Sequence, residues 1–74
     1  MKVNVELFGQ LLPGVQRRQT FTMESPMNVQ EVAEWLGLNP KEIGLITING
    51  VQSELEDTVP PNSRLCFFPH ISGG

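Results

Sequence analysis

One helix with its own start and stop signals lies in the middle of this chain. Asn28 is a favourable N-cap residue, and Glu31 follows three positions later as its capping-box partner. Gly37 supplies a left-handed stop at the other end. Between these ends, apolar residues recur at i, i+3, i+4 and i+7, namely Val29, Val32, Ala33 and Leu36. The spacing predicts one short amphipathic helix with a single apolar face.

Segments of alternating polar and apolar residues precede this helix and predict two strands. The first is expected over Lys2–Phe8 and the second over Arg18–Glu24. The turn signal Pro13-Gly14 lies between them, so the two strands are expected to form a hairpin. The apolar residues assigned to their inner faces are Val3, Val5, Leu7, Phe21 and Met23.

After the helix, Asn39-Pro40 predicts a turn or a second short helix. Leu45–Asn49 is expected to form a strand, and Asn49-Gly50 is a tight-turn dipeptide that leads into a short edge strand over Val51–Leu55. The last strand is expected over Arg64–Phe68. Its inward residues are predicted to be Leu65 and Phe67, and its outward residues Arg64, Cys66 and Phe68.

The order of these elements predicts an α+β domain with a mixed sheet of four to five strands and one main helix packed on one face. This order fits the β-grasp, or ubiquitin-like, arrangement, in which the first and last strands lie side by side in the centre of the sheet. A chain of 74 residues has room for one such domain. We expect residues 1–68 to form it and residues 69–74 to form a flexible C-terminal tail that ends in Gly-Gly.

Charge and cysteine content exclude several classes of protein. The formal net charge is −3, and Arg17-Arg18 is the only adjacent basic pair, which argues against a nucleic-acid partner. No stretch reaches the roughly 20 apolar residues of a membrane span. A single cysteine, Cys66, allows no intrachain disulfide and no ordinary structural zinc site. A reducing, cytoplasmic location is therefore expected, with no membrane partner.

The sequence contains no conventional catalytic set, so we do not expect a free-standing enzyme. Cys66 is interpreted as a partly buried sheet residue, and a nucleophilic pair with His70 is disfavoured because His70 falls in the tail. Trp35 is expected to pack over the sheet edge rather than to bind a ligand. The acidic residues Glu54, Glu56 and Asp57 form a solvated loop more readily than a cation site, and Asp57 is a candidate cap for the following turn.

The unusual feature is the pair Gly73-Gly74. Glycine at a frayed chain end can be without function. Glycine also lacks a Cβ, so a Gly-Gly tail can enter a channel too narrow for other residues and deliver its α-carboxylate to a partner's active site. Adenylation by ATP would give that carboxylate a good leaving group. A sulfur donor would then replace the adenylate and leave a thiocarboxylate on Gly74, with Gly73 as the threading neighbour.

Together, these features resemble the MoaD/ThiS-type ubiquitin-like sulfur carriers, and most closely the small subunit of molybdopterin synthase. The matching pieces are residues 1–9, Ile48-Asn49-Gly50 and residues 65–74. The resemblance implies adenylation of Gly74 by an E1-like adenylyltransferase (MoeB/ThiF-like), then thiocarboxylation by a sulfur donor. It further implies insertion of the tail into the MoaE-like large catalytic subunit, where sulfur passes to a pterin precursor. No cofactor would be bound by the carrier, because ATP is used by the activating enzyme.

The sequence departs from the family pattern in two places. Asn62-Ser63 stands where the family usually has Gly-Asp in the turn before the last strand, and Phe68-Pro69-His70 replaces the common Phe-Pro-Pro. The first change alters a structural position only. The second leaves the acceptor of the sulfur open.

A surface for binding the partner is predicted at the base of the tail. If the first and last strands are neighbours, the rings of Phe8 and Phe68 form an exposed apolar patch there. His70 and Ile71 are candidate contacts next to it. The alternative is that the loop carrying Leu11 and Leu12 folds over the rings.

Three other functions remain open. The first is a ThiS-like sulfur carrier for thiamine thiazole or another thio-metabolite, although the Phe-Phe-Pro run favours the molybdopterin pathway. The second is a non-conjugating ubiquitin-like interaction module. The third is a modifier that forms isopeptide bonds through Gly74.

Overall fold

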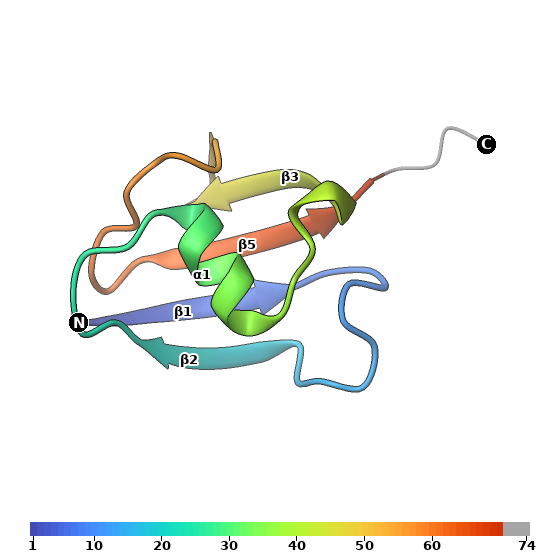
Figure 1. Cartoon of the computed structure of the whole chain (residues 1–74), viewed down its shortest axis with the longest axis horizontal. Coiled ribbons are helices and arrows are strands. Elements are labelled where there is room, and N and C mark those ends of the chain that lie inside the picture. Colours follow the sequence, from blue (N-terminus) through green and yellow to red (C-terminus); the bar gives the residue numbers. More distant parts are fainter. Residues whose placement is uncertain (71–74) are drawn as a thin grey trace.

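The structure is a computed structural model that describes residues 1–70. These residues form one sheet and one main helix (Figure 1). The elements are β1 (Lys2–Leu7), β2 (Arg18–Thr22), α1 (Val29–Leu36), the 3₁₀ helix η1 (Pro40–Glu42), β3 (Ile43–Ile48), β4 (Val51–Ser53) and β5 (Arg64–Pro69). This order confirms the predicted α+β, β-grasp fold.

The five strands are arranged in the order β2-β1-β5-β3-β4. The first and last strands, β1 and β5, run parallel at the centre of the sheet, with Val5 opposite Leu65. The other neighbours are antiparallel, so the sheet is mixed. The predicted hairpin of β1 and β2 and the predicted central pair are both confirmed.

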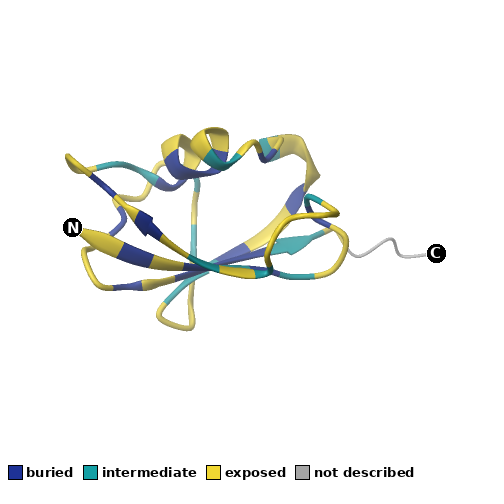
Figure 2. Cartoon of the chain, turned by 90° about the horizontal axis from the view of Figure 1, so that it is seen from below, coloured by how far each residue is buried: buried dark blue, intermediate teal, exposed yellow. Residues whose placement is uncertain are grey.

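Helix α1 begins and ends where the sequence predicts. The Asn28 side chain accepts a hydrogen bond from the backbone N–H of Glu31 at 2.8 Å, and the Glu31 carboxylate accepts one from the N–H of Asn28 at 2.9 Å. Gly37 ends the helix with a φ of 90°, a conformation that glycine adopts without steric cost. Within residues 1–70, α1 lies over one face of the sheet and no helix lies over the other (Figure 2).

The core lies between α1 and the covered face of the sheet. Phe67 and Leu65 of β5 are fully buried, as predicted, and each contributes about 1.5–3 kcal/mol through burial. The other buried apolar residues from strands and helix include Val3, Val5, Leu7, Phe21, Met23, Val29, Val32, Ala33 and Ile46. Val59, in the segment before β5, is also buried, although no pattern predicted it.

Several strand limits differ from the prediction. β1 ends at Leu7 rather than Phe8, β2 at Thr22 rather than Glu24, and β4 at Ser53 rather than Leu55. β3 begins two residues early, at Ile43, because a register shift between Ile43 and Leu45 lets both residues pair with β5. β5 extends to Pro69, one residue past the predicted domain limit, and the division of the chain at residue 68 stays a prediction.

No helix among residues 1–70 has the length and apolar character needed to cross a membrane.

Candidate functional site

The sheet face opposite α1 carries two aromatic rings from opposite ends of the chain. Phe68 lies on β5 and Phe8 directly follows β1, and their rings stack with 4.4 Å between centroids and 12° between planes. Leu45 of β3 pairs with Phe68 across the sheet and is 38% exposed. We call Phe8, Leu45 and Phe68 the outer apolar patch. Both rings are half-buried, so their faces remain partly open to solvent.

An open hollow of about 430 Å³ adjoins the outer apolar patch. It lies where the chain leaves the sheet, and its lining is Phe8, Gly9, Gly44, Leu45, Phe68, Pro69 and His70. Leu11 and Leu12, in the loop after β1, do not line it: Leu11 is buried in the core and Leu12 packs against the core. The structure therefore brings Phe8 and Phe68 together as an accessible pair, and their role in binding a partner stays a prediction.

The start of the predicted tail is attached to the domain. The ring Nε2 of His70 lies 2.8 Å from the backbone carbonyl oxygen of Lys41 in η1, within hydrogen-bond distance. The His70 side chain is otherwise exposed, as expected for a spacer or an interface contact. Three other predicted site residues, Ile71, Gly73 and Gly74, lie outside the described residues.

Cys66 is buried, with 4% of its surface exposed, although the sequence pattern placed it outward. The alternation is correct, but the outer face at this point is crowded. Cys66 lies opposite Glu6 on β1 and Thr47 on β3, and Arg64 and Phe68 precede and follow it on the same face of β5. Neighbours on all four sides therefore cover a small side chain. A buried thiol at the centre of a sheet lacks the access that a nucleophile needs.

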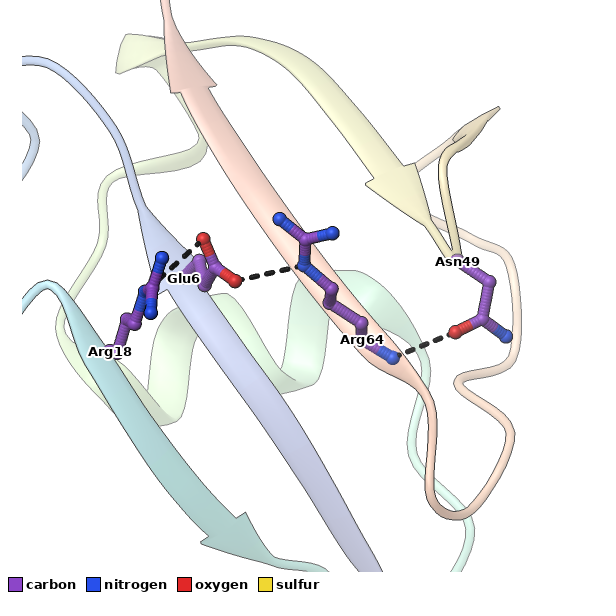
Figure 3. Close-up of polar contacts among 4 residues, drawn as sticks. All are labelled: Glu6, Arg18, Asn49 and Arg64. Carbon is purple, nitrogen blue, oxygen red and sulfur yellow. Dashed lines mark hydrogen bonds and ion pairs between the residues drawn. The ribbon is translucent and has the colours of Figure 1, made fainter.

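Two ion pairs that share Glu6 join β2, β1 and β5 on one half of the sheet (Figure 3). Arg64 Nε donates to Glu6 Oε1 at 2.8 Å, and Arg18 Nε lies 3.7 Å from Glu6 Oε2. The hydrogen bond from Arg64 is the largest influence that lowers the pKa of Glu6, and the same bond raises the pKa of Arg64. The pairing of Glu6 with Arg64 was not predicted from the sequence. Both residues were on outward faces of neighbouring strands, so the parallel register was the missing signal.

The acidic residues before β5 form a turn. Asp57 Oδ2 accepts a hydrogen bond from the N–H of Glu54 at 2.8 Å, and the N–H of Asp57 donates to the carbonyl of Glu54 at 3.1 Å. Asp57 therefore closes the turn in which it lies, rather than capping the turn after it. Across residues 1–70, no group of three His, Cys, Asp or Glu side chains is arranged to hold a metal ion.

Trp35 packs over the sheet edge, as predicted. Its ring meets the ring of Phe21 on the edge strand β2 edge-on, with 4.5 Å between centroids and 62° between planes. It remains 69% exposed.

The fold and the site define a β-grasp, ubiquitin-like domain with an apolar patch where its last strand ends. The chain belongs to the ThiS family, whose sequence profile matches residues 5–74. This match confirms the resemblance to the MoaD/ThiS-type ubiquitin-like sulfur carriers. No curated protein matches the chain significantly.

Two solved structures are similar to this chain over the whole length of both proteins. SAMP1 from Haloferax volcanii has 19% sequence identity and a TM-score of 0.76. A chain of the complex of subunits 1 and 2 of molybdopterin-converting factor from Helicobacter pylori 26695 has 19% identity and a TM-score of 0.59. At this level of identity the two likenesses support the fold.

Proposed function

We propose that this protein is a sulfur carrier that acts as the small subunit of molybdopterin synthase. Its Gly74 carboxyl group would be adenylated, converted to a thiocarboxylate and used to give sulfur to a pterin precursor. The observation that carries the sulfur-carrier part of the proposal is the ThiS family match, which runs through Gly74 and includes Gly73. The outer apolar patch supports it, because a carrier needs a surface on which its partners dock.

The chemistry takes place at the Gly74 carboxyl group and balances without any cofactor on the carrier. A carboxylate oxygen attacks the α-phosphorus of ATP, which forms the acyl adenylate and releases pyrophosphate. A sulfide equivalent from the sulfur donor then attacks the acyl carbon and expels AMP, and the carbonyl is retained. The product is a thiocarboxylate, whose sulfur is a soft nucleophile. The E1-like enzyme supplies ATP and the active site, so the carrier itself has no catalytic role in this proposal.

The outer apolar patch is proposed as the docking surface for the large catalytic subunit and for the E1-like enzyme. Phe8 and Phe68 are half-buried and stacked, so they present a rigid apolar surface with little conformational entropy to lose on binding. Aromatic anchors of this kind are enriched at the centres of interfaces. His70 and Ile71 are proposed as flanking contacts on the path of the tail. The proposed location of the adenylation and sulfur-transfer reactions is the cytoplasm.

The assignment of the acceptor to a pterin rests on two observations. The run Phe67-Phe68-Pro69 before the tail resembles that of molybdopterin synthase small subunits. One similar structure is a complex of molybdopterin-converting factor subunits. The second candidate is a carrier for thiamine thiazole or another thio-metabolite. The ThiS family match supports the two candidates equally.

Intact mass spectrometry of the protein from its native cytosol, without added reductant, tests the carrier chemistry. The expected result is a species with one oxygen replaced by sulfur, mapped to the Gly74 carboxyl group. A variant with one residue appended after Gly74 is the control and should show no such species. Failure to find the species in the wild type, even after incubation with ATP, a sulfide source and the host's E1-like enzyme, would favour the non-conjugating interaction module.

The acceptor is tested separately. The thiocarboxylated carrier is mixed with the host's large molybdopterin synthase subunit and the pterin precursor. Formation of the dithiolene product supports the first candidate. Retention of the thiocarboxylate there, together with sulfur transfer to the thiazole-forming enzyme, would favour the second.

A further inference from the structure

Two glycines, Gly9 and Gly44, lie against the point at which β5 leaves the sheet. Gly9 follows β1, and Gly44 lies on β3, so they approach Pro69 from the two strands that flank β5. Both line the hollow beside the outer apolar patch. The ring of Pro69 occupies the space where a side chain at position 9 would stand. Backbone atoms of Pro69 and His70 occupy the corresponding space at position 44.

The contact at Gly44 is with backbone. A Cβ atom at this position would lie 2.7 Å from the carbonyl oxygen of Pro69, and 2.8 and 2.9 Å from the Cα and N atoms of His70. Such distances are below van der Waals contact, and backbone atoms at the end of a paired strand cannot rotate away as a flexible side chain would. Any residue other than glycine at position 44 therefore displaces the base of the tail.

The local fold gives no other reason for glycine at position 44. Gly44 does not have a left-handed φ, so the backbone conformation itself accepts other residues. It lies in the register shift between Ile43 and Leu45, where β3 pairs with Pro69 and with Phe68. The absence of a side chain at Gly44 allows the backbone of β3 to approach the backbone of Pro69 and His70 closely.

Gly9 makes the corresponding contact from the other side. A Cβ atom there would lie 2.5 Å from Cγ and 3.0 Å from Cδ of Pro69. The N–H of Phe8 donates to the carbonyl of Phe67 at 3.0 Å, which ends the β1–β5 ladder just before this contact. The Pro69 ring is thus held against Gly9, while the backbone of Pro69 and His70 is held against Gly44.

A third restraint comes from η1. The ring Nε2 of His70 lies 2.8 Å from the carbonyl oxygen of Lys41, and the N–H of Lys41 donates to the Asn39 side chain at 3.0 Å. The first residue after β5 is therefore fixed by its backbone and by its ring.

We propose that Gly9 and Gly44 form a seat that sets the direction in which the C-terminal tail leaves the domain, and that Gly44 is thereby a positioning residue for delivery of the Gly74 carboxyl group. This inference rests on the proposed function. The outer apolar patch and the base of the tail then form one rigid unit, so docking of the patch also aims the tail at the partner's active site. Misplacement of a reacting group by about 1 Å can cost on the order of 100-fold in rate.

The test is the steady-state adenylation of the full chain by the host's E1-like enzyme with ATP. In Gly44→Ala, kcat is expected to fall about 10- to 100-fold, while KM, which reports docking through the patch, changes less than about threefold. The matched control is Gly50→Ala, in the turn between β3 and β4, where no atom lies within 4 Å of an added Cβ but the φ of 82° strains any other residue. This control destabilises the domain without touching the tail, so its kcat should stay within about twofold of the wild type.

A second variant and a direct structural measurement accompany this test. His70→Ala removes the contact with Lys41 at an exposed position, so it should fold normally and lower kcat about three- to tenfold. NMR of the wild type should show a close contact between the Hα protons of Gly44 and His70, and this contact should be lost in Gly44→Ala. If Gly44→Ala does not fold, His70→Ala decides.

The inference is overturned if folded Gly44→Ala and His70→Ala both retain wild-type kcat, or if Gly50→Ala loses as much kcat as Gly44→Ala. It is also overturned if the loss appears in KM alone, because the glycine would then shape only the docking surface. A wild-type protein that the enzyme does not adenylate would contradict the proposed function itself. The two failures are therefore distinguishable.

Discussion

The rings of Phe8 and Phe68 lie nearly parallel, with 4.4 Å between their centroids. One residue follows the first strand and the other lies on the last, and the parallel pairing of β1 with β5 brings them together. Stacked rings of this kind add about 0.5–1.5 kcal/mol beyond the area they bury. The pair therefore stiffens the outer face beside the tail, which is the proposed docking surface.

The first prediction concerns Phe68→Glu. A carboxylate at the centre of an apolar interface must be desolvated on binding, so the affinity for the large synthase subunit should fall by at least about 2 kcal/mol, or roughly 30-fold. The domain should remain folded, because the ring is on the face opposite the core. Calorimetric titration measures the affinity, and circular dichroism measures the fold.

Val51→Glu is the matched control for this variant, since Val51 is 68% exposed on the edge strand β4. It introduces the same charge away from the patch and should bind normally. Global unfolding of Phe68→Glu would instead show that the ring belongs to the core.

The parts of the fold that the sequence predicted correctly depend on short-range signals. The capping box of Asn28 and Glu31 and the stop at Gly37 act within a few residues, so the limits of α1 are confirmed. Strand alternation likewise assigned Leu65 and Phe67 to the core. The proximity of Phe8 to Phe68 was predicted because the fold class places the first strand beside the last.

The features that were missed depend on contacts between distant segments. The burial of Cys66 needs neighbours from three strands, and the contact of Gly44 with Pro69 and His70 depends on a register shift in β3. Alternation within one strand carries no information about either. The Glu6–Arg64 pair could be predicted from the sequence only if the register of β1 against β5 were known.

The second prediction is a pH-dependent effect of Glu6→Gln. Arg64 lowers the pKa of Glu6 from its ordinary value of 4.5. A carboxyl group with a lowered folded-state pKa contributes stability that is fully present above the unfolded-state pKa and is lost as the pH falls through the folded-state pKa. Glu6→Gln should therefore have a lower Tm than the wild type at pH 7, and the difference should close as the pH falls below about 4.5. Thermal unfolding from pH 7 to pH 3 measures it.

Glu56→Gln is the charge-matched control, because it removes a carboxylate from the loop before β5 and outside this ion pair. If the Tm difference between Glu6→Gln and the wild type were as large at pH 3 as at pH 7, the interaction of the Glu6 charge with Arg64 would not be its cause.

The third prediction concerns the core at the central strand. Leu65 is fully buried on β5, so Leu65→Ala leaves a cavity and should lower the free energy of unfolding by about 2–5 kcal/mol. That is a large share of the stability of so small a domain. Urea denaturation measures it. Val51→Ala, at an exposed position, should change stability by less than about 0.5 kcal/mol, and equal losses in the two variants would contradict the assignment of the core.

The fourth prediction separates two roles of Asn49. Its φ of 52° lies in the left-handed region, and its side-chain oxygen accepts a hydrogen bond from the N–H of Arg64 at 2.9 Å (Figure 3). Asn49→Ala loses both the tolerance of this backbone conformation and the hydrogen bond, so it should cost about 1.5–3 kcal/mol. Asn49→Gly keeps the backbone conformation and loses only the side-chain acceptor, so it should cost about 0.5–1.5 kcal/mol.

Asn49→Asp completes the series, because aspartate keeps an acceptor oxygen and tolerates the left-handed region. Its stability in urea denaturation should lie within about 0.5 kcal/mol of the wild type. The expected order of stability, from highest to lowest, is therefore wild type and Asn49→Asp, then Asn49→Gly, then Asn49→Ala. If Gly were as stable as the wild type, the bond to Arg64 would contribute nothing, and the turn between β3 and β4 would depend on backbone conformation alone. If Gly were as unstable as Ala, the hydrogen bond would account for the whole effect, and the start of β5 would depend on this one side chain.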